Sequence, residues 1–537
     1  MTRTMTPWFR RWPRQSEACN VLRGVGLAFS LALAALSSSW AQTAAPAQET
    51  GGAVLSYRPH SETEIAAAVQ QPLTLEACIG IALRKNISLR IAEKELRKAE
   101  AAHSGSHGVF FPVFSLEGSR DNTLERVRQQ DSTDAYFGPF IDNEFLNQAN
   151  VTGRVQWFVP TGATLEFSNN FVHKATDFRS PLLKPDDPKL QKSDNRVYAV
   201  SLTQPLLRGA GPKVARSGVL SSGYAEQIQR VQLQQERLQT VLLVKRAYYD
   251  ALAKRELMKV NAAAVQSDSV LVRASEALTV AKLASRRDVL SAQIRFSDDR
   301  AAFIKAQNDF ELALDALKDV MGLPIEMPIR VDSAGLSYIP IVLQEAELVQ
   351  LALQNNPQLQ TAQIDIKRNR LLRSVAKNAV LPKLDLVASY SSDHGKDALQ
   401  NQNTARLGGW QASLSLSYAF LSREAGAEAE NAELNVRQQE DRTLELQRQI
   451  VVSIRDIVRS VYTAAGEITA IAQSIKSAED KLDFSRTMFN LGRASNFDVT
   501  DAQEFLLKAK TQYFRKLAEY HTQLAFLESL TGRPLIP

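Results

Sequence analysis

The stretch NLGRASNFDVTDAQ at residues 490 to 503 repeats the pattern of KLASRRDVLSAQ at residues 282 to 293. The two stretches share the skeleton A-S-x-x-D-V-x-x-A-Q at an offset of 210 residues. The matched pairs include Ala284/Ala494, Ser285/Ser495, Asp288/Asp498 and Gln293/Gln503. A short polar phrase that recurs between helix-like segments predicts that one chain builds the same turn twice.

The duplication extends over most of the chain. Residues 73 to 90 (LTLEACIGIALRKNISLR) align with residues 343 to 360 (LQEAELVQLALQNNPQLQ) at an offset of 270. Further along, VKRAYYDALA and VRSVYTAAGE align at an offset of 214. The sequence therefore predicts two structural repeats, 73–323 and 343–534, joined by a linker at 324–342. The fall in offset assigns 56 extra residues to the first repeat, between Pro112 and Tyr248.

The second part of each repeat has the composition of long helices. It is rich in Ala, Leu, Gln, Glu, Arg and Lys, and it contains no proline from 213 to 323 or from 383 to 533. We expect long helices at 213–282 and 423–490, each about 105 Å long, followed by helices at 286–320 and 496–530. The duplicated phrase then lies at the tip of each helical hairpin, near 282–288 and 490–501.

Two rows of apolar residues run along the first of these long helices. One row contains Ile228, Val231 and Leu238, and the other contains Val241, Val244 and Tyr248. A two-stranded coiled coil needs a single row, whereas a helix with neighbours on both sides needs two. A closed ring of helices fits this pattern, and a compact helical bundle is the alternative.

Short segments with alternating hydrophobicity lie within 112–207 and 382–420. Alternation over about ten residues between polar loops is typical of membrane-barrel strands. We expect four strands, or six if an extra hairpin forms around residues 159 to 162. The aromatic residues Trp157, Trp410 and Tyr418 fall in these segments and suit a membrane interface. A soluble β-sandwich edge is the alternative.

A membrane-spanning sheet has to close on itself, because each unpaired backbone group in lipid costs several kcal/mol. Four to six strands are too few for one chain to close a barrel. If these strands lie in a membrane, closure requires several copies of the chain.

The start of the chain predicts export. Five arginines precede an apolar run at 24 to 36, and small residues end it, so we expect a signal peptide at 1–41 cleaved after Ala41. A retained membrane anchor is the alternative. Residues 42–72 are expected to form a flexible mature N-terminus.

Cleavage changes the charge and the cysteine content. It lowers the formal net charge from +6 to +2, so a nucleic-acid partner is not expected. It also leaves Cys78 as the one cysteine, which excludes an intrachain disulfide.

Together these features resemble the TolC-like outer-membrane efflux protein family. The resemblance covers about residues 73 to 535. It rests on two features that occur in both repeats, the L-x-x-A-x-x-x-A-L-x-x-N phrase and the hairpin tip. It also rests on the proline that opens each strand pair and on the stretch SLTQPLLRGAG at 201 to 211. It implies a mainly α fold with transmembrane β: a trimeric β-barrel continuous with a long periplasmic α-helical barrel, with two repeats per chain. The segments at 54–72 and 324–342 would lie around its waist.

The resemblance also implies a passive duct through the outer membrane for an efflux or type I secretion system. Its partners would be a periplasmic adaptor, an inner-membrane transporter, two further copies of the chain and outer-membrane lipid. Adaptor tips would meet the hairpin tips at small or flexible residues. The positions implied are Lys282, Ala284, Ser285, Gly492, Ala494 and Ser495.

The same tips carry the gate in the family. Asp498 and Asp501 match the paired acids of the closed aperture, where three chains would form a cation-selective ring that divalent ions block. They can equally be solvated acids at a helix start. Asp288 matches the acid of the closing lock, but Phe489 stands at its tyrosine position. Ala494 stands at its arginine position, so the partner is expected to be Arg493 or else Arg286 or Arg287.

No catalytic constellation, cofactor fingerprint or metal site is expected. His103 and His107 have metal-ligand spacing, but Gly105 interrupts the helix and no third ligand lies near in sequence. We expect a non-enzyme. The alternative function is a non-conducting periplasmic coiled-coil protein that bridges the envelope layers.

Overall fold

The computed structural model describes residues 71–129, 140–179, 189–282, 285–332, 336–397, 402–420, 423–491 and 493–533. All of them belong to one compact unit, Ala53–Pro537. The expected signal peptide, 1–41, and all but the last two residues of the segment 42–72 lie outside the described ranges.

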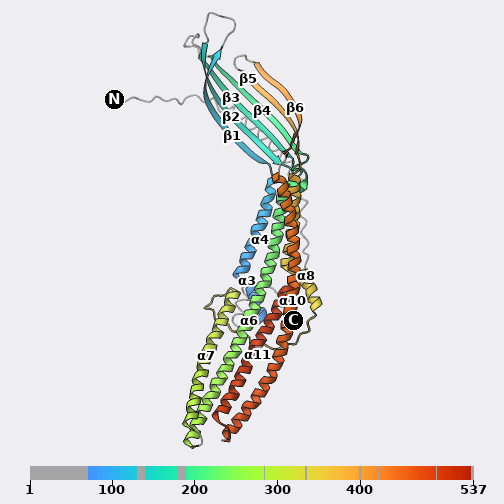
Figure 1. Ribbon diagram of the computed structural model, residues 1–537. Helices are drawn as coiled ribbons and strands as arrows, with labels where there is room; N and C mark the ends of the chain where they lie inside the picture. Colours follow the sequence, from blue (N-terminus) through green and yellow to red (C-terminus); the bar gives the residue numbers. More distant parts are fainter. Residues whose placement is uncertain are drawn as a thin grey trace, which may run out of the picture. The chain divides into compact units, whose positions relative to one another are not determined.

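The strands form one antiparallel sheet in which neighbours in sequence are neighbours in space (Figure 1). Within the described residues the sheet has six strands, which decides between the four and six left open by the sequence. The strands are β1 Val113–Gln129, β2 Phe140–Phe158, β3 Thr164–Arg179, β4 Lys189–Pro205, β5 Lys383–Asp397 and β6 Gln402–Ser417. The first repeat supplies four of them, so its extra residues account for the additional pair.

The turn between β2 and β3 requires a glycine. The Val159 N–H donates to the carbonyl of Ala163 at 2.8 Å. Gly162 has a φ of 96°, and a Cβ there would lie 2.6 Å from the carbonyl oxygen of Gly209. Only glycine adopts this backbone conformation at such close approach without strain, which fixes the turn against the segment that leaves β4.

Most of the described chain is helical, and the longest helices lie in the second part of each repeat (Figure 1). In repeat one they are α3 Leu75–Lys85, α4 Ile87–Ser106, the 3₁₀ turn η1 His107–Phe110, α5 Pro212–Ala215, α6 Ser217–Val280 and α7 Arg286–Met321. In repeat two they are α8 Glu345–Asn355, α9 Pro357–Ala379, α10 Arg423–Asn490 and α11 Asn496–Thr531. The expectation of a mainly α chain with antiparallel strands is confirmed. None of the described helices is both long and apolar enough to cross a membrane.

Each repeat breaks its first helix at an asparagine. Asn86 ends α3 and caps α4, where its side-chain oxygen accepts from the Leu89 N–H at 3.0 Å. Asn356 caps α9 in the same way by accepting from the Leu359 N–H at 3.2 Å. A side-chain oxygen at this position satisfies a backbone donor that the first turn leaves free. The Asn86 amide also donates to the carbonyl of Val320 at 2.8 Å, which ties the break to the end of α7.

The second hairpin helix of each repeat ends at a glycine. Gly322 and Gly532 have φ values of 69° and 70°, the left-handed conformation that terminates many helices. At Gly322 a Cβ would lie 2.4 Å from the carbonyl oxygen of Lys85. The end of α7 therefore packs directly against the break between α3 and α4.

Two apolar cores surround these helix breaks, one per repeat. The first includes Ile79, Tyr248, Leu252, Leu317 and Met321. The second includes Leu348, Ile454, Leu517, Tyr520 and Leu524. Each core joins a short N-terminal helix to the middle of the long hairpin of its own repeat, so the repeats are equivalent in packing as well as in sequence.

A buried ion pair connects the two repeats. The Lys245 ammonium on α6 donates to the carboxylate of Glu528 on α11, and the side chains are 7% and 2% exposed. Nearby, the His521 ring stacks on Tyr249 with 4.3 Å between ring centroids. Burial lowers the pKa of His521, so this polar cluster carries one ion pair and a neutral ring.

We expect Glu528→Ala to destabilise the chain by about 3–5 kcal/mol, because it leaves the Lys245 ammonium buried without its carboxylate. Thermal or denaturant unfolding in detergent measures the change. The matched control is Glu519→Ala on the same helix, which removes an exposed partner of Lys516 and should cost under about 1 kcal/mol. Equal effects of the two substitutions would contradict the prediction.

Candidate functional site: the two hairpin tips

The first copy of the duplicated phrase forms the start of α7. Ser285 is the N-cap residue, with φ −88° and ψ 154°. Its backbone N–H and its hydroxyl donate to one carboxylate oxygen of Asp288, at 2.9 and 2.8 Å. The Asp288 N–H donates back to the Ser285 hydroxyl at 3.3 Å. This reciprocal pair is a capping box, which satisfies backbone donors that a helix start leaves free.

The second copy forms the same structure at the start of α11. Ser495 is the N-cap residue, and its N–H and hydroxyl donate to the Asp498 carboxylate at 2.7 and 2.8 Å. Hydrogen bonds from the serines lower the pKa of both Asp288 and Asp498, because they stabilise the charged carboxylates. The shared skeleton A-S-x-x-D thus encodes two helix starts.

The turn before each capping box reverses the chain. Lys282 has a φ of 60°, the left-handed conformation that favours glycine, and its N–H donates to the carbonyl of Thr279 at 3.0 Å. In the second tip the Arg493 N–H donates to the carbonyl of Met488 at 2.8 Å. Ala284 and Gly492 lie outside the described residues.

A small apolar core holds the two tips together. It contains Leu271, Ala292, Leu482, Phe489, Val499 and Ala502, with Ala494 packed against it. Phe489, which stands at the tyrosine position of the family's lock, is 7% exposed and fills this core. A hydroxyl at this position would have to find a partner in an apolar setting, so phenylalanine suits the packing.

The tips also meet through one polar contact. The Asn496 amide, at the start of α11, donates to the backbone carbonyl of Asp288 at 3.0 Å. Asn496 is 4% exposed. Within the described residues, the Asp288 carboxylate makes no ion pair with Arg286, Arg287 or Arg493. The link between the tips of this chain is therefore an asparagine–backbone hydrogen bond.

The second acid of the expected ring already has a cationic partner. One carboxylate oxygen of Asp501 lies 2.7 Å from the Lys481 ammonium on α10. That ammonium also lies 4.1 Å from the centroid of the Phe505 ring, a cation–π distance. Lys481 therefore neutralises part of the negative charge that Asp501 brings to the tip.

A buried pair of acids lies above the tip, between α6 and α7. Asp268 is 1% exposed, and burial, together with the Asp299 carboxyl beside it, raises its pKa to about 7. A buried negative charge beside a second carboxyl is unfavourable, so the protonated form of Asp268 is favoured. The Arg295 guanidinium lies 3.3 Å from the Asp299 carboxylate and 3.6 Å from the Glu504 carboxylate of α11. The positive charges of Arg295 and Arg486 lower the pKa of Asp268, against the effect of burial.

Ser267, the neighbour of Asp268, links the two hairpins. Its hydroxyl accepts from Arg486 on α10 and from Gln503 on α11. A hollow of about 470 Å³ lies beside these residues, and Phe489 and Val499 of the tip core also line it. The buried acids, this hydroxyl and the tip core therefore form one continuous structure at the interface between the hairpins.

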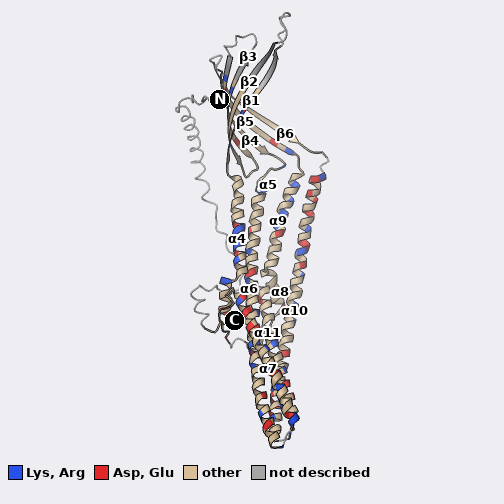
Figure 2. Ribbon diagram, turned by 90° about the vertical axis from the view of Figure 1, so that its left-hand side faces the viewer, with Lys and Arg blue, Asp and Glu red and all other residues tan. Residues whose placement is uncertain are grey.

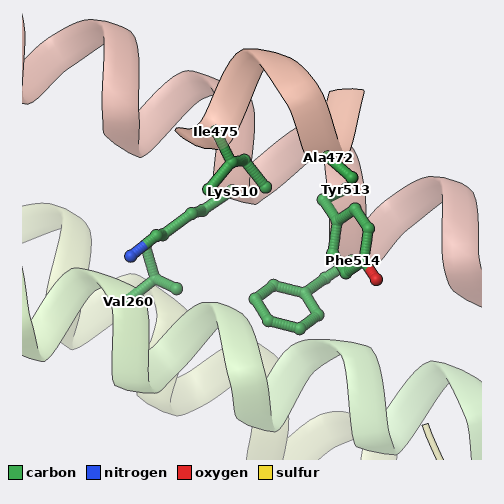
Figure 3. A pocket seen from close by; sticks show the side chains of 6 residues that line it. All are labelled: Val260, Ala472, Ile475, Lys510, Tyr513 and Phe514. Atoms are coloured by element: carbon green, nitrogen blue, oxygen red, sulfur yellow. The ribbon is translucent and has the colours of Figure 1, made fainter. Parts of the chain in front are cut away.

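A second hollow of about 380 Å³ lies farther from the tips (Figure 3). Val260 of α6 lines it together with residues of α10 and α11, namely Ala472, Ile475, Lys510, Tyr513 and Phe514. The Lys510 ammonium pairs with Glu479 at 2.8 Å. The lining is apolar apart from this paired lysine and the tyrosine, which indicates a packing gap between helices.

Sequence reasoning missed four residues of this site: Asn496, Lys481, Asp268 and Asp299. Asn496 sits at a variable position of the duplicated phrase, and Lys481 lies 20 residues before its partner. The sequence did contain a signal for Asp268: an acidic residue stands where the helical spacing of α6 predicts an apolar one.

Comparison with known proteins shows what this chain is similar to. Residues 348–533 match the family described as Outer membrane efflux protein. The alkaline protease secretion protein AprF of Pseudomonas aeruginosa is 24% identical over 381 residues, which cover 68% of this chain and 76% of AprF. The outer membrane protein TolC of Vibrio cholerae is 22% identical over 300 residues, which cover 54% of this chain and 67% of TolC.

Solved structures agree with the fold. The outer membrane protein VceC of Vibrio cholerae aligns with a TM-score of 0.60 and 15% identity, covering 85% of this chain and 96% of VceC. Over residues 348–533 the chain is similar to the outer membrane efflux protein family, and the curated relatives extend this similarity to 68% of the chain. It is an outer-membrane channel component of an efflux or type I secretion system, with a periplasmic portion.

The described part of this efflux protein holds no group of three or more potential metal ligands. The His103 ring, singled out for its spacing from His107, makes a 3.0 Å hydrogen bond to the hydroxyl of Ser222 and lies 5.2 Å from the His107 ring. His103 therefore connects α4 to α6. The proteins that match this chain are described as an outer membrane efflux protein family, a protease secretion protein and an outer-membrane channel.

The interface aromatics lie in two settings. The Trp157 indole N–H donates to the carbonyl of Phe110 at 2.9 Å, so it ties β2 to the turn that ends the first helix pair. Trp410 is 81% exposed on β6. Tyr418, just past β6, contacts Phe420 with 5.1 Å between ring centroids.

We expect the stability of this efflux protein to fall between about pH 4 and pH 7 because of Asp268. In this window the folded chain holds a proton that an unfolded aspartate releases near pH 3.8, so the free energy of unfolding decreases as the pH rises. Asp268→Asn should remove this dependence and stabilise the protein at pH 8 by on the order of 2 kcal/mol. Unfolding followed by circular dichroism from pH 4.5 to 8 measures it.

Asp298→Asn is the matched control, because Asp298 is exposed on the neighbouring position of α7. It should leave the pH dependence of unfolding as it is in the wild type. A wild-type and an Asp268→Asn protein with parallel pH profiles would contradict the raised pKa of Asp268.

Proposed function

We propose that three copies of this chain close their sheets into one β-barrel in the outer membrane and their helices into one periplasmic duct. The duct conducts substrate passively from a periplasmic adaptor and an inner-membrane transporter to the exterior. The single observation that carries the proposal is the division of the six-stranded sheet into an apolar and a polar face.

The apolar face is a continuous row across all strands. Residues directly opposite each other on neighbouring strands share a face. One such row contains Phe114, Val155, Phe167, Val200, Tyr390 and Trp410. An apolar band of this kind suits contact with lipid chains.

The adjacent rows face the other way and are polar. One contains Val113, Gln156, Glu166, Ser201, Ser389 and Gln411. Arg154, two residues from Gln156 along β2, pairs with Glu166 at 3.0 Å on this face. Charged residues of both signs also occur along the helices (Figure 2). A polar face fits the lumen of a water-filled channel.

The edges of the sheet explain why several copies are needed. Within the described residues, β1 and β6 each pair on one side only. Open edges are not tolerated in lipid. Three chains with six strands each would give about 18 strands, a size class in which barrels keep an aqueous channel.

The hairpin tips are the proposed contact for the adaptor and the proposed gate. The docking positions are Lys282, Ala284, Ser285, Gly492, Ala494 and Ser495. Asp498 and Asp501, with Asp288 and Arg493 nearby, would ring the aperture. The capping box of Asp498 and the Lys481 partner of Asp501 limit the charge that this ring exposes.

We expect Asp501→Asn to reduce cation selectivity and block by divalent cations, because it removes three charges from the ring of a trimer. Lys481→Met should do the opposite, since it frees the Asp501 carboxylate. Asp498 is left unchanged in both variants, because its substitution would also remove a helix cap worth about 1 kcal/mol. Single-channel recordings in planar bilayers measure the reversal potential and the block. Identical values for both variants and the wild type would contradict the gate assignment.

Purification from outer-membrane fractions tests the proposal as a whole. We expect heat-modifiable trimers that conduct in planar bilayers and that retain an adaptor after cross-linking. Recovery only as a non-conducting species would instead support a structural protein that bridges the envelope layers.

A further inference from the structure

The apolar face of the sheet changes character toward the strand ends that lie away from the helices. On the β4 strand, Leu202, Val200 and Tyr198 are followed on the same face by Arg196 and Asp194. Strand alternation places every second residue on one face. The apolar band thus ends at a group of charged and imidazole side chains, which we call the rim cluster: His173, Asp194, Arg196 and His394.

The register brings the rim cluster together from three strands. Arg196 lies opposite Phe171 of β3 and opposite His394 of β5. Asp194 lies opposite His173 of β3. All of them share the face of Phe167, Val200 and Tyr390, because each is an even number of residues away from a member of that row.

The rim cluster leaves the Arg196 guanidinium available to bind a ligand. His173 Nδ1 lies 2.6 Å from an Asp194 carboxylate oxygen, so the one acid already has a partner. The Arg196 guanidinium stacks over the Phe171 ring at 5.1 Å, which fixes its direction. Among the described residues, the Arg196 guanidinium makes no ion pair or hydrogen bond; its ring contact with Phe171 is its one side-chain interaction there. His394 lies beside it and contacts the Tyr198 ring with 6.1 Å between centroids.

The height of the cluster matches one surface of a membrane. Arg196 lies nine residues from the end of β4 at Pro205, and His173 nine residues from the start of β3 at Thr164. At about 3.3 Å per residue and a strand tilt near 40°, this is a rise of roughly 23 Å. The apolar band of outer-membrane barrels is about 25 Å tall. The cluster then lies at the level of the outer-leaflet headgroups.

We propose that the rim cluster is a binding site for the headgroup phosphate of an outer-leaflet glycolipid, with Arg196 as its main donor and His394 beside it. This rests on the proposed barrel. A planar guanidinium offers paired donors that match phosphate geometry. An outer-membrane glycolipid such as lipopolysaccharide carries its phosphates at this depth, and its acyl chains would lie along the aromatic row below. Exposed Lys192, two residues beyond Asp194 on the same face, extends the positive charge outward.

The opposite face provides the matched control. Lys174 is exposed on β3 next to His173, at the same height, but alternation places it on the lumenal face. Lys174→Gln removes one positive charge without touching the rim cluster. Arg196→Gln removes the proposed phosphate donor.

The experiment measures binding of purified lipopolysaccharide to delipidated trimers in detergent, by native mass spectrometry and by titration. We expect Arg196→Gln to bind roughly tenfold more weakly than the wild type, and Lys174→Gln to bind equally well. Lipopolysaccharide stripped of its lipid A phosphates should bind wild-type trimers as weakly as intact lipid binds Arg196→Gln. If Arg196→Gln does not form trimers, His394→Gln is measured in its place.

Three results would overturn the site: equal binding by Arg196→Gln and the wild type, equal binding of the dephosphorylated lipid, or an equal loss in Lys174→Gln. Phosphatidylglycerol bound as tightly as lipopolysaccharide would overturn the assignment to a glycolipid. Displacement by inorganic phosphate at similar concentration would show a free-anion site instead. Trimer formation and conductance are recorded for every variant, so failure of the barrel is seen separately from failure of the lipid site.

Discussion

The structure depends on one constraint, the need to satisfy the backbone groups at the two edges of the sheet. The β1 and β6 strands each pair on one side only within the described residues. In water such edges bind solvent, but in lipid each unpaired group costs several kcal/mol. In the proposed barrel this cost couples folding of the strands to association of chains. The two apolar rows of α6 need no neighbouring copy, because Ile228, Leu238 and Tyr248 are already buried within one chain.

The duplication could be predicted from sequence because each repeat uses local signals that do not depend on partners. The serine and aspartate of the shared skeleton form a capping box within four residues, so a helix start at 286 and 496 follows from the sequence alone. Strand number was harder to predict. The second pair, β2 and β3, depends on a turn at Gly162 that packs against Gly209, 47 residues away, and no local rule predicts that contact.

The proposed gate residues illustrate the limit of residue-by-residue transfer. Asp288, Asp498 and Asp501 occupy the expected positions, yet their carboxylates engage Ser285, Ser495 and Lys481. The polar contact between the tips uses Asn496 and a backbone carbonyl, which any residue at position 288 would supply. Which groups meet depends on how the two hairpins pack against each other, and the sequence pattern does not encode that packing.

The substitution of phenylalanine at position 489 has a consequence for how the tip could open. In a lock built from a tyrosine, an aspartate and an arginine, opening breaks charged hydrogen bonds, each worth about 1.5–3 kcal/mol. Here opening would separate an apolar core around Phe489 and one neutral hydrogen bond from Asn496. Apolar contacts are insensitive to salt, whereas exposed ion pairs are screened by it. If the tip is the gate proposed above, its closed form should therefore resist ionic strength better than a lock of charges, and its pH response should come from the buried Asp268 rather than from the aperture itself.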